Sequence, residues 1–207
     1  MKHTLKITFL LILIFFTAQV VGLAIIGKYV HVEEYIDPAT SLPVKEVIAK
    51  DLPYSLERPQ IEQSSSYIWI TAAILIGTAL LLILIRLGKI GWWFWKLWFF
   101  LAVFLTMAVA FSAFIQQQIA LLLAFALAAI KVYKPTPIVQ NFTEVFIYGG
   151  LAAIFVPVIN IFAAFMLLII ISIYDIIAVR HTKHMVKLAK FQAKTNVFAG
   201  LFVPYGR

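Results

Sequence analysis

The stretch WWFWKLWFFLAVFLTMAVAFSAFIQQQIALLLAFALAAIKVY, residues 92–133, decides the fold class of this 207-residue chain. As a single helix, its 42 residues would be about 63 Å long at 1.5 Å per residue. That length is twice the roughly 30 Å thickness of the hydrocarbon core of a bilayer. The stretch is therefore expected to cross a membrane twice. The three glutamines at residues 116–118 mark the predicted turn between the two crossings.

The composition of the whole chain indicates an integral membrane protein. Hydrophobic residues make up 63% of the sequence and charged residues only 13%, and the mean hydropathy is +0.99. The net charge of +8 does not indicate nucleic-acid binding, because the basic residues cluster at the ends of apolar runs. There is no cysteine, and no carboxylate follows the pair His181 and His184 at ligand spacing, so we expect no metal and no other cofactor.

The same length argument predicts six transmembrane helices. Residues 142–179 are also too long for one crossing, and Pro157 and Asn160 mark the break. The predicted spans are residues 5–27, 67–87, 92–114, 117–133, 142–157 and 159–179. Residues 28–66, with seven acids and four prolines, are expected to form a mostly irregular polar loop. Asn141, with Glu144 three residues later, is predicted to cap the fifth helix.

The basic residues predict the orientation in the membrane, because short loops rich in Lys and Arg stay on the cytoplasmic side. With the N terminus inside, thirteen of the seventeen lysines and arginines lie inside. The four others fall in the acidic loop; they are Lys28, Lys45, Lys50 and Arg58. We therefore expect a multi-pass protein of the cell membrane, whose N terminus and whose segment after Val179 are cytoplasmic.

The chain changes character after the last predicted span. Residues 180–195 place four lysines on one helical face and apolar residues opposite, which predicts a basic amphipathic helix on the inner membrane surface. A soluble polar tail is the alternative. Residues 196–207 are rich in β-branched and aromatic residues and are interpreted as a short strand.

Asp175 is the only ionisable side chain that this prediction places well inside a span. A charge there costs about 2.5 to 3.5 kcal/mol even on lenient insertion scales, so such a residue is by default a functional candidate. Helical periodicity puts Ser172 on the same face, which favours contact with protein or water rather than lipid. The structural alternative is an aspartate that reaches the interface or pairs with Arg180.

The dipeptide Tyr174-Asp175 in IISIYDIIAV closely resembles the first catalytic motif of the presenilin and signal peptide peptidase family of intramembrane aspartyl proteases. In that family a YD motif lies on the sixth transmembrane helix. The continuation RHTKHMVKLAKFQAKTNVFAGLFVPY is similar to the loop after that helix in archaeal presenilin homologues. The resemblance implies helices one to six of a nine-helix fold, with Asp175 as a catalytic residue. Tyr174 and Ser172 are the candidate supporting residues, although Tyr174 is equally an ordinary aromatic at headgroup level.

The resemblance also implies a chemistry that needs two aspartates. The pair shares a proton and activates a water that attacks a peptide carbonyl. The family's second aspartate lies in a GxGD motif, and a PAL motif follows; neither occurs in these 207 residues. We therefore expect this chain to be inactive alone and to need a C-terminal three-helix part with GxGD. Its substrates would be transmembrane helices, which an edge strand would bind through Val197, Phe198, Leu201 and Val203.

A second hypothesis comes from another class of protein. A transporter or channel subunit would use Asp175 for proton or cation coupling, and a scaffold would bind single-span proteins without cutting them. The predicted spans offer only weak polar partners for Asp175, and no inverted repeat of the transporter kind is visible. Those partners are Gln19, Thr71, Thr78, Thr106 and Ser112.

Overall fold

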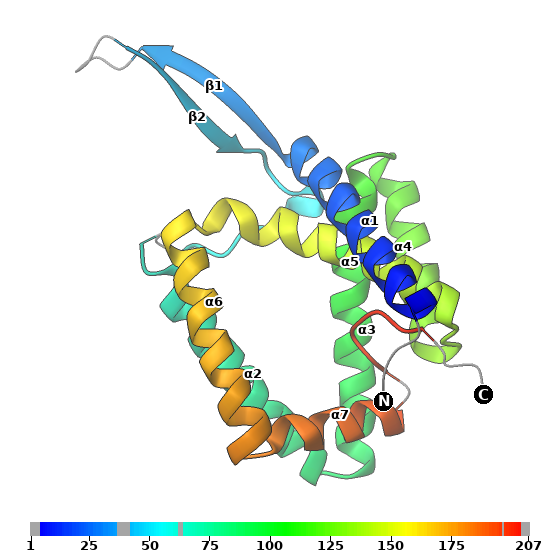
Figure 1. Ribbon diagram of the computed structural model, residues 1–207. Coiled ribbons are helices and arrows are strands. Elements are labelled where there is room, and N and C mark those ends of the chain that lie inside the picture. Colours follow the sequence, from blue (N-terminus) through cyan, green and yellow to red (C-terminus); the bar gives the residue numbers. More distant parts are fainter. Residues whose placement is uncertain (1–4, 37–41, 62–63, 196, 204–207) are drawn as a thin grey trace.

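Apolar helices form the body of the protein. The computed structural model describes residues 5–36, 42–61, 64–195 and 197–203. The apolar helices alternate in direction along the chain (Figure 1); they are α1 (Leu5–Tyr29), α2 (Ser66–Arg86), α3 (Lys89–Ser112), α4 (Gln117–Tyr133), α5 (Pro137–Phe155) and α6 (Ile161–Ile176). Within the described ranges, five are long and apolar enough to cross a membrane, and α4, with 17 residues, is apolar but shorter. The fold is that of an all-α polytopic membrane protein.

The start of α5 differs most from the sequence prediction. The helix begins at Pro137, five residues before the predicted span, because Thr136 and Pro137 form its first turn. The Thr136 hydroxyl accepts a hydrogen bond from the Val139 amide at 3.3 Å, and proline suits the first helical position because it has no amide to leave unpaired. The prediction that Asn141 caps this helix was therefore wrong, since Asn141 lies inside the first turns.

The break between α5 and α6 lies at the predicted proline and asparagine. Pro157 sits in a single 3-10 turn, η2 (Val156–Val158), and Asn160 caps α6. The Asn160 side-chain oxygen accepts a hydrogen bond from the Ala163 amide at 2.7 Å. Pro157 lacks the amide that would continue the α-helix, and Asn160 supplies the acceptor that starts the next one.

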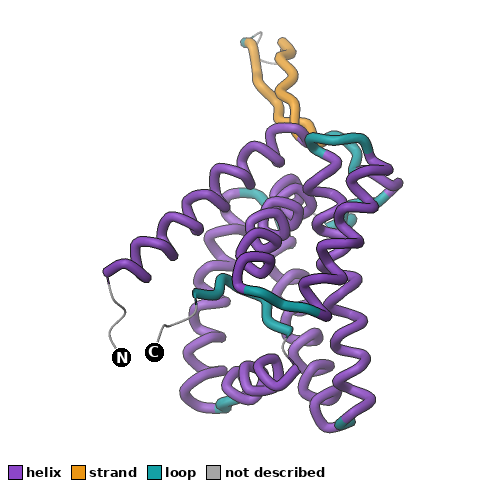
Figure 2. Tube along the Cα trace, turned by 90° about the vertical axis from the view of Figure 1, so that its right-hand side faces the viewer, coloured by secondary structure: helices purple, strands orange, loops and turns teal. Residues whose placement is uncertain are grey.

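The polar segment after α1 is more ordered than predicted. Strands β1 (Val30–Ile36) and β2 (Pro43–Ala49) form an antiparallel hairpin that projects beyond the helices (Figure 2), so the expectation of a mostly irregular loop was wrong for these residues. Their β-branched residues favour a strand, and Pro43 stands first in its strand, where a missing amide is tolerated.

A turn after the hairpin fastens this segment to the helices. It contains the single 3-10 turn η1 (Pro53–Ser55), and the Tyr54 hydroxyl donates to the Gln117 carbonyl at 2.6 Å. The Arg58 guanidinium reaches the Ala153 carbonyl at 3.4 Å. Burial lowers the pKa of Arg58, and the nearby Asp51 carboxylate opposes that shift. The polar segment is thus held against α4 and α5.

The helices fall into two groups on opposite sides of the molecule (Figure 1). One group is the pair α2 and α6, which pack side by side, and the other comprises α1, α3, α4 and α5. A further helix, α7 (His184–Thr195), runs from the foot of α6 towards α3, at the end of the molecule opposite the hairpin. There the Phe191 ring lies 6.3 Å from that of Trp95 on α3.

Two consecutive glycines allow α5 to approach its neighbours closely. A Cβ at Gly149 would clash with the Ile25 side chain and would lie 3.3 Å from the Gly22 backbone of α1. A Cβ at Gly150 would clash with the Thr106 carbonyl oxygen of α3. Small residues let helix backbones pack together in a membrane, where association depends on close van der Waals contact. These glycines therefore set the spacing of α1, α3 and α5.

We expect Gly150→Ala to destabilise the protein, by about 1 to 3 kcal/mol, because the added methyl group meets a backbone carbonyl that cannot turn away. Gly77→Ala is the matched control, since a Cβ at Gly77 would meet no atom within 4 Å. Alanine favours a helix interior more than glycine does, so the control should be neutral or slightly stabilised. Thermal unfolding in detergent, followed by circular dichroism, measures both. Equal midpoints for the two variants would contradict the packing argument.

Candidate active site

Asp175 lies at the penultimate position of α6 with its side chain exposed. Ala163, Leu167 and Ala178 are buried along the stripe that faces α2, and Asp175 lies roughly 100° around the helix from half-buried Tyr174, which belongs to that stripe. Among the described residues, the carboxylate has no hydrogen-bond or ion-pair partner. The pairing with Arg180 that the sequence left open is not formed. The Asp175 carboxylate is thus exposed and has no polar partner among the described residues.

Tyr174 joins three helices through its hydroxyl group. The hydroxyl lies 2.9 Å from Nε2 of His184 on α7 and 3.3 Å from Oγ1 of Thr78 on α2. On the other side of the imidazole, Nδ1 lies 2.6 Å from Oγ1 of Thr182. The tyrosine is therefore more than an aromatic anchor at headgroup level, because its polar end is engaged by neighbouring elements.

Ser172 does not take part in this group of contacts. Its hydroxyl donates to the Leu168 carbonyl of its own helix at 2.7 Å, and its side chain is exposed. It shares with Asp175 only the side of α6 that faces away from α2.

The segment after α7 forms no strand within residues 197–203, so the strand interpretation was wrong there; residues 196 and 204–207 lie outside the described ones. β-branched and aromatic residues favour a strand only when another strand pairs with them. Here the backbone is held by α5 instead. The Gln140 side-chain nitrogen donates to the Phe198 and Gly200 carbonyls at 2.7 and 2.9 Å. Asn141 donates to the Phe202 carbonyl at 2.8 Å and accepts from the Phe202 amide at 2.7 Å.

The side chains proposed from sequence to bind substrate differ in exposure. Val197 is buried in the helical core, with 1% of its surface exposed. Leu201 and Val203 are half-buried, and Phe198 is exposed.

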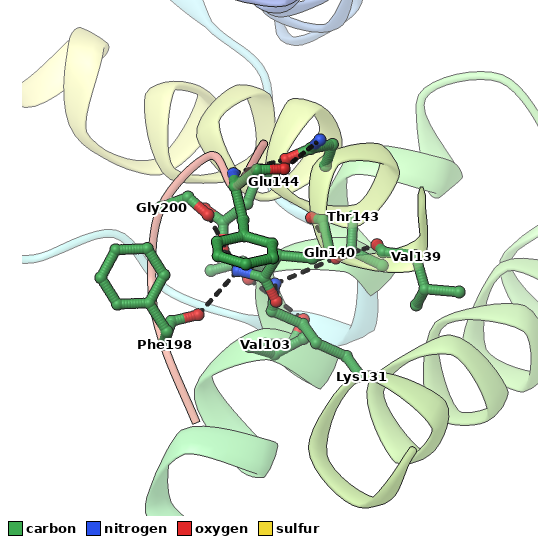
Figure 3. Close-up of polar contacts among 11 residues, drawn as sticks. Val103, Lys131, Val139, Gln140, Thr143, Glu144, Phe198 and Gly200 are labelled. Atoms are coloured by element: carbon green, nitrogen blue, oxygen red, sulfur yellow. Dashed lines mark hydrogen bonds and ion pairs between the residues drawn. The ribbon is translucent and has the colours of Figure 1, made fainter. Parts of the chain in front are cut away.

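A buried ion pair supports the anchor of this segment (Figure 3). Nζ of Lys131 on α4 donates to Oε1 of Glu144 at 2.8 Å, to Oε1 of Gln140 at 2.9 Å and to Oγ1 of Thr143 at 3.1 Å. The three contacts use all three ammonium hydrogens. Lys131 is 2% exposed and Glu144 1% exposed. Buried charges are tolerated when they are paired and hydrogen-bonded in this way.

This pair places two further ionisable side chains, besides Asp175, within the apolar helices. The sequence prediction counted Lys131 only among the basic residues on the inner side and Glu144 only with the predicted helix cap. Both residues lie inside the ranges that were predicted as spans, and their opposite charges were the available signal. The contact of His184 with Tyr174 was also missed.

Comparison with known proteins identifies the family. A family model described as signal-peptide peptidase, presenilin aspartyl protease matches residues 39–205. No curated protein matches the chain. Among solved structures, a presenilin family intramembrane aspartate protease is similar in fold, with a TM-score of 0.54 and 20% sequence identity. The match covers 86% of this chain and 65% of that one, so this chain spans about two thirds of its length. The family model covers most of the chain, including Tyr174-Asp175, and the chain therefore belongs to the signal-peptide peptidase and presenilin aspartyl protease family.

Proposed function

We propose that this chain supplies Asp175 as the first catalytic aspartate of an intramembrane protease that cuts transmembrane helices. The observation that carries the proposal is the free carboxylate near the end of an apolar helix. Asp175 is exposed and has no polar partner in the described chain, although an unpaired charge at membrane depth is costly. A second carboxylate and a catalytic water would give it partners.

The chemistry requires that second carboxylate. Two aspartates a few ångströms apart cannot both ionise easily, so one holds a proton while the other, as carboxylate, activates water. The water attacks the peptide carbonyl, and the protonated member donates to it or to the leaving amine. No aspartate follows Asp175 in the 207 residues. We infer that activity needs a three-helix part with GxGD, and that the chain alone is inactive.

The orientation follows from the positions of the basic residues. The whole of α7 lies at the end of the molecule opposite the hairpin, and α1 begins away from the hairpin (Figure 1). Exposed Lys187, Lys190 and Lys194 lie along α7. Basic segments remain in the cytoplasm, so we propose that this end is cytoplasmic and that the hairpin lies outside.

Substrate contact is proposed for three of the four residues named from sequence. Phe198, Leu201 and Val203 keep exposed or half-buried side chains on a segment whose backbone is already anchored. The Val197 side chain fills the helical core and is excluded from this role.

Reconstitution tests the proposed function. The chain is co-expressed with the three C-terminal helices of a presenilin homologue that carry GxGD, and the two parts are co-purified into proteoliposomes with a transmembrane substrate. We expect cleavage from the pair and none from either part alone. A partner with its aspartate changed to alanine is the matched control. Cleavage by the chain alone, or none by a pair shown to co-purify, contradicts the proposal.

A further inference from the structure

We infer that His184 is a positioning residue that holds Tyr174, and through it Asp175, in place. The catalytic meaning of this inference rests on the proposed function of Asp175. His184 touches neither the carboxylate nor any other reacting group; it acts through the tyrosine hydroxyl. The group of contacts that it completes, here called the Tyr174 clasp, comprises Thr78, Tyr174, Thr182 and His184.

The donor and acceptor roles in the clasp can be assigned by starting from Thr78. The Thr78 hydroxyl donates its only hydrogen to the Ile74 carbonyl at 2.8 Å, so towards Tyr174 it can only accept. The tyrosine hydroxyl therefore donates to Thr78 at 3.3 Å, and its oxygen is left to accept a hydrogen bond from His184 Nε2 at 2.9 Å. The clasp thus needs a hydrogen on Nε2.

Nε2 can carry this hydrogen whether the ring is neutral or protonated, because Nδ1 can either accept from Thr182 or donate to it. In the neutral ring, Nδ1 accepts from the Thr182 hydroxyl at 2.6 Å. In the protonated ring, Nδ1 donates to Thr182, whose own hydrogen then goes to the Ile177 carbonyl at 3.3 Å or the Ala178 carbonyl at 3.4 Å. In both states Nε2 remains the donor to Tyr174. The clasp therefore keeps its geometry whether or not the ring carries a charge.

The backbone between Asp175 and His184 is shaped to bring the ring back to Tyr174. A π-helix over Ile177–His181 follows α6 directly, and Lys183 adopts a left-handed conformation with φ of 53°. A π-turn is rare and is found often at functional sites, and a left-handed lysine is unfavourable unless its surroundings hold it. Together they turn the chain so that α7 starts beside α6.

The clasp determines where Asp175 lies because it fixes the helix on which Asp175 stands. Tyr174 precedes Asp175 directly, so pinning its hydroxyl to α2 and α7 restrains both rotation and tilt of this part of α6. The Asp175 carboxylate has no hydrogen bond or ion pair of its own in the described chain to do this. A displacement of about 1 Å in a catalytic group costs up to roughly a hundredfold in rate.

The first test uses the chain alone in nanodiscs. The sequence has no cysteine, so Leu168→Cys and Lys194→Cys, both at exposed positions on α6 and α7, take two unique spin labels. Leu168 lies two turns before Asp175 on the same face of α6. We expect His184→Leu to broaden the distance distribution measured by double electron–electron resonance. His184→Gln keeps an N–H donor at a similar reach and should restore the narrow distribution.

His181→Leu is the matched control for this measurement. The His181 side chain is exposed and makes no hydrogen bond in the described part of the chain, so its loss should change nothing. An unchanged distribution in His184→Leu, or equal broadening in both leucine variants, overturns the inference.

The second test uses the completed enzyme. We expect His184→Leu to lower kcat by about tenfold with KM within roughly twofold, because binding is kept while alignment is lost. Tyr174→Phe should have a similar effect, the double variant should be no worse than either single one, and His184→Gln should recover most of the rate. Wild-type kcat in His184→Leu overturns the inference. If the wild-type pair cuts nothing, the proposed function fails, and the spin-label experiment still decides the clasp.

Discussion

Replacing Asp175 with alanine should abolish cleavage in the completed enzyme, lowering the rate by about a thousandfold or more. The remaining aspartate of the pair would have no partner to share a proton with, so neither water activation nor proton donation would take place at the required positions. The cleavage product of a transmembrane substrate in proteoliposomes, measured over hours, gives the residual rate. Cleavage that survives this substitution would exclude Asp175 as a catalytic residue.

The fold should tolerate the loss of Asp175. Its carboxylate makes no hydrogen bond or ion pair in the described chain, so the thermal midpoint of the variant should match that of the wild type. Asp51→Ala is the matched control, because it removes the same group from the polar segment beyond the helices. We expect that variant to cut at the wild-type rate. A loss of rate in both variants would point to a general effect of charge.

Breaking the buried ion pair of Lys131 and Glu144 should lower the free energy of unfolding more than Gly150→Ala does. Lys131→Met leaves the Glu144 carboxylate buried without its cation, and Glu144→Leu leaves the ammonium group without its anion. Each is expected to destabilise the protein by about 3 to 5 kcal/mol. The double variant should be less destabilised than Lys131→Met, because two apolar side chains replace two charges and no unpaired ion remains. Unfolding in mixed detergent micelles measures all three.

The exposed neighbour Lys134 gives the matched control for the pair. Lys134→Met removes the same charge three residues later and should leave stability within about 0.5 kcal/mol of the wild type. The single variants at the ion pair should also release the segment after α7, since Gln140 contacts Lys131 through its oxygen and this segment through its nitrogen. Limited proteolysis should therefore cut near Phe198 in those variants only. Equal stability of Lys131→Met and Lys134→Met would show that the pair contributes nothing.

Features that depend on local sequence could be predicted well. Apolar run length and the three consecutive glutamines located the helices, and Pro157 with Asn160 located the break before α6. The catalytic candidate was also found this way, because an aspartate within an apolar run is conspicuous without any knowledge of its neighbours. Resemblance to a family then suggested a role for it.

Features that depend on residues distant in the chain could not be predicted in this way. Lys131 and Glu144 are 13 positions apart, and only the antiparallel packing of α4 against α5 joins them. The strand prediction after α7 failed for a similar reason, since nothing local shows that Gln140 captures the carbonyls of that segment. His184 became visible only when the π-turn after α6 brought its ring to Tyr174.

The anchor of the segment after α7 has a consequence for how this protein can vary. Within this segment, Gln140 and Asn141 bind only main-chain atoms, which belong to Phe198, Gly200 and Phe202. Every amino acid supplies the carbonyl groups, and every one except proline supplies the amide that Asn141 binds. Except for buried Val197, side chains along the segment can thus change without loss of the attachment. Gly200 is a further exception, because its φ of 147° is a backbone conformation that residues with a side chain rarely adopt. The proposed substrate contacts can therefore diverge along this segment while its place in the fold stays constant.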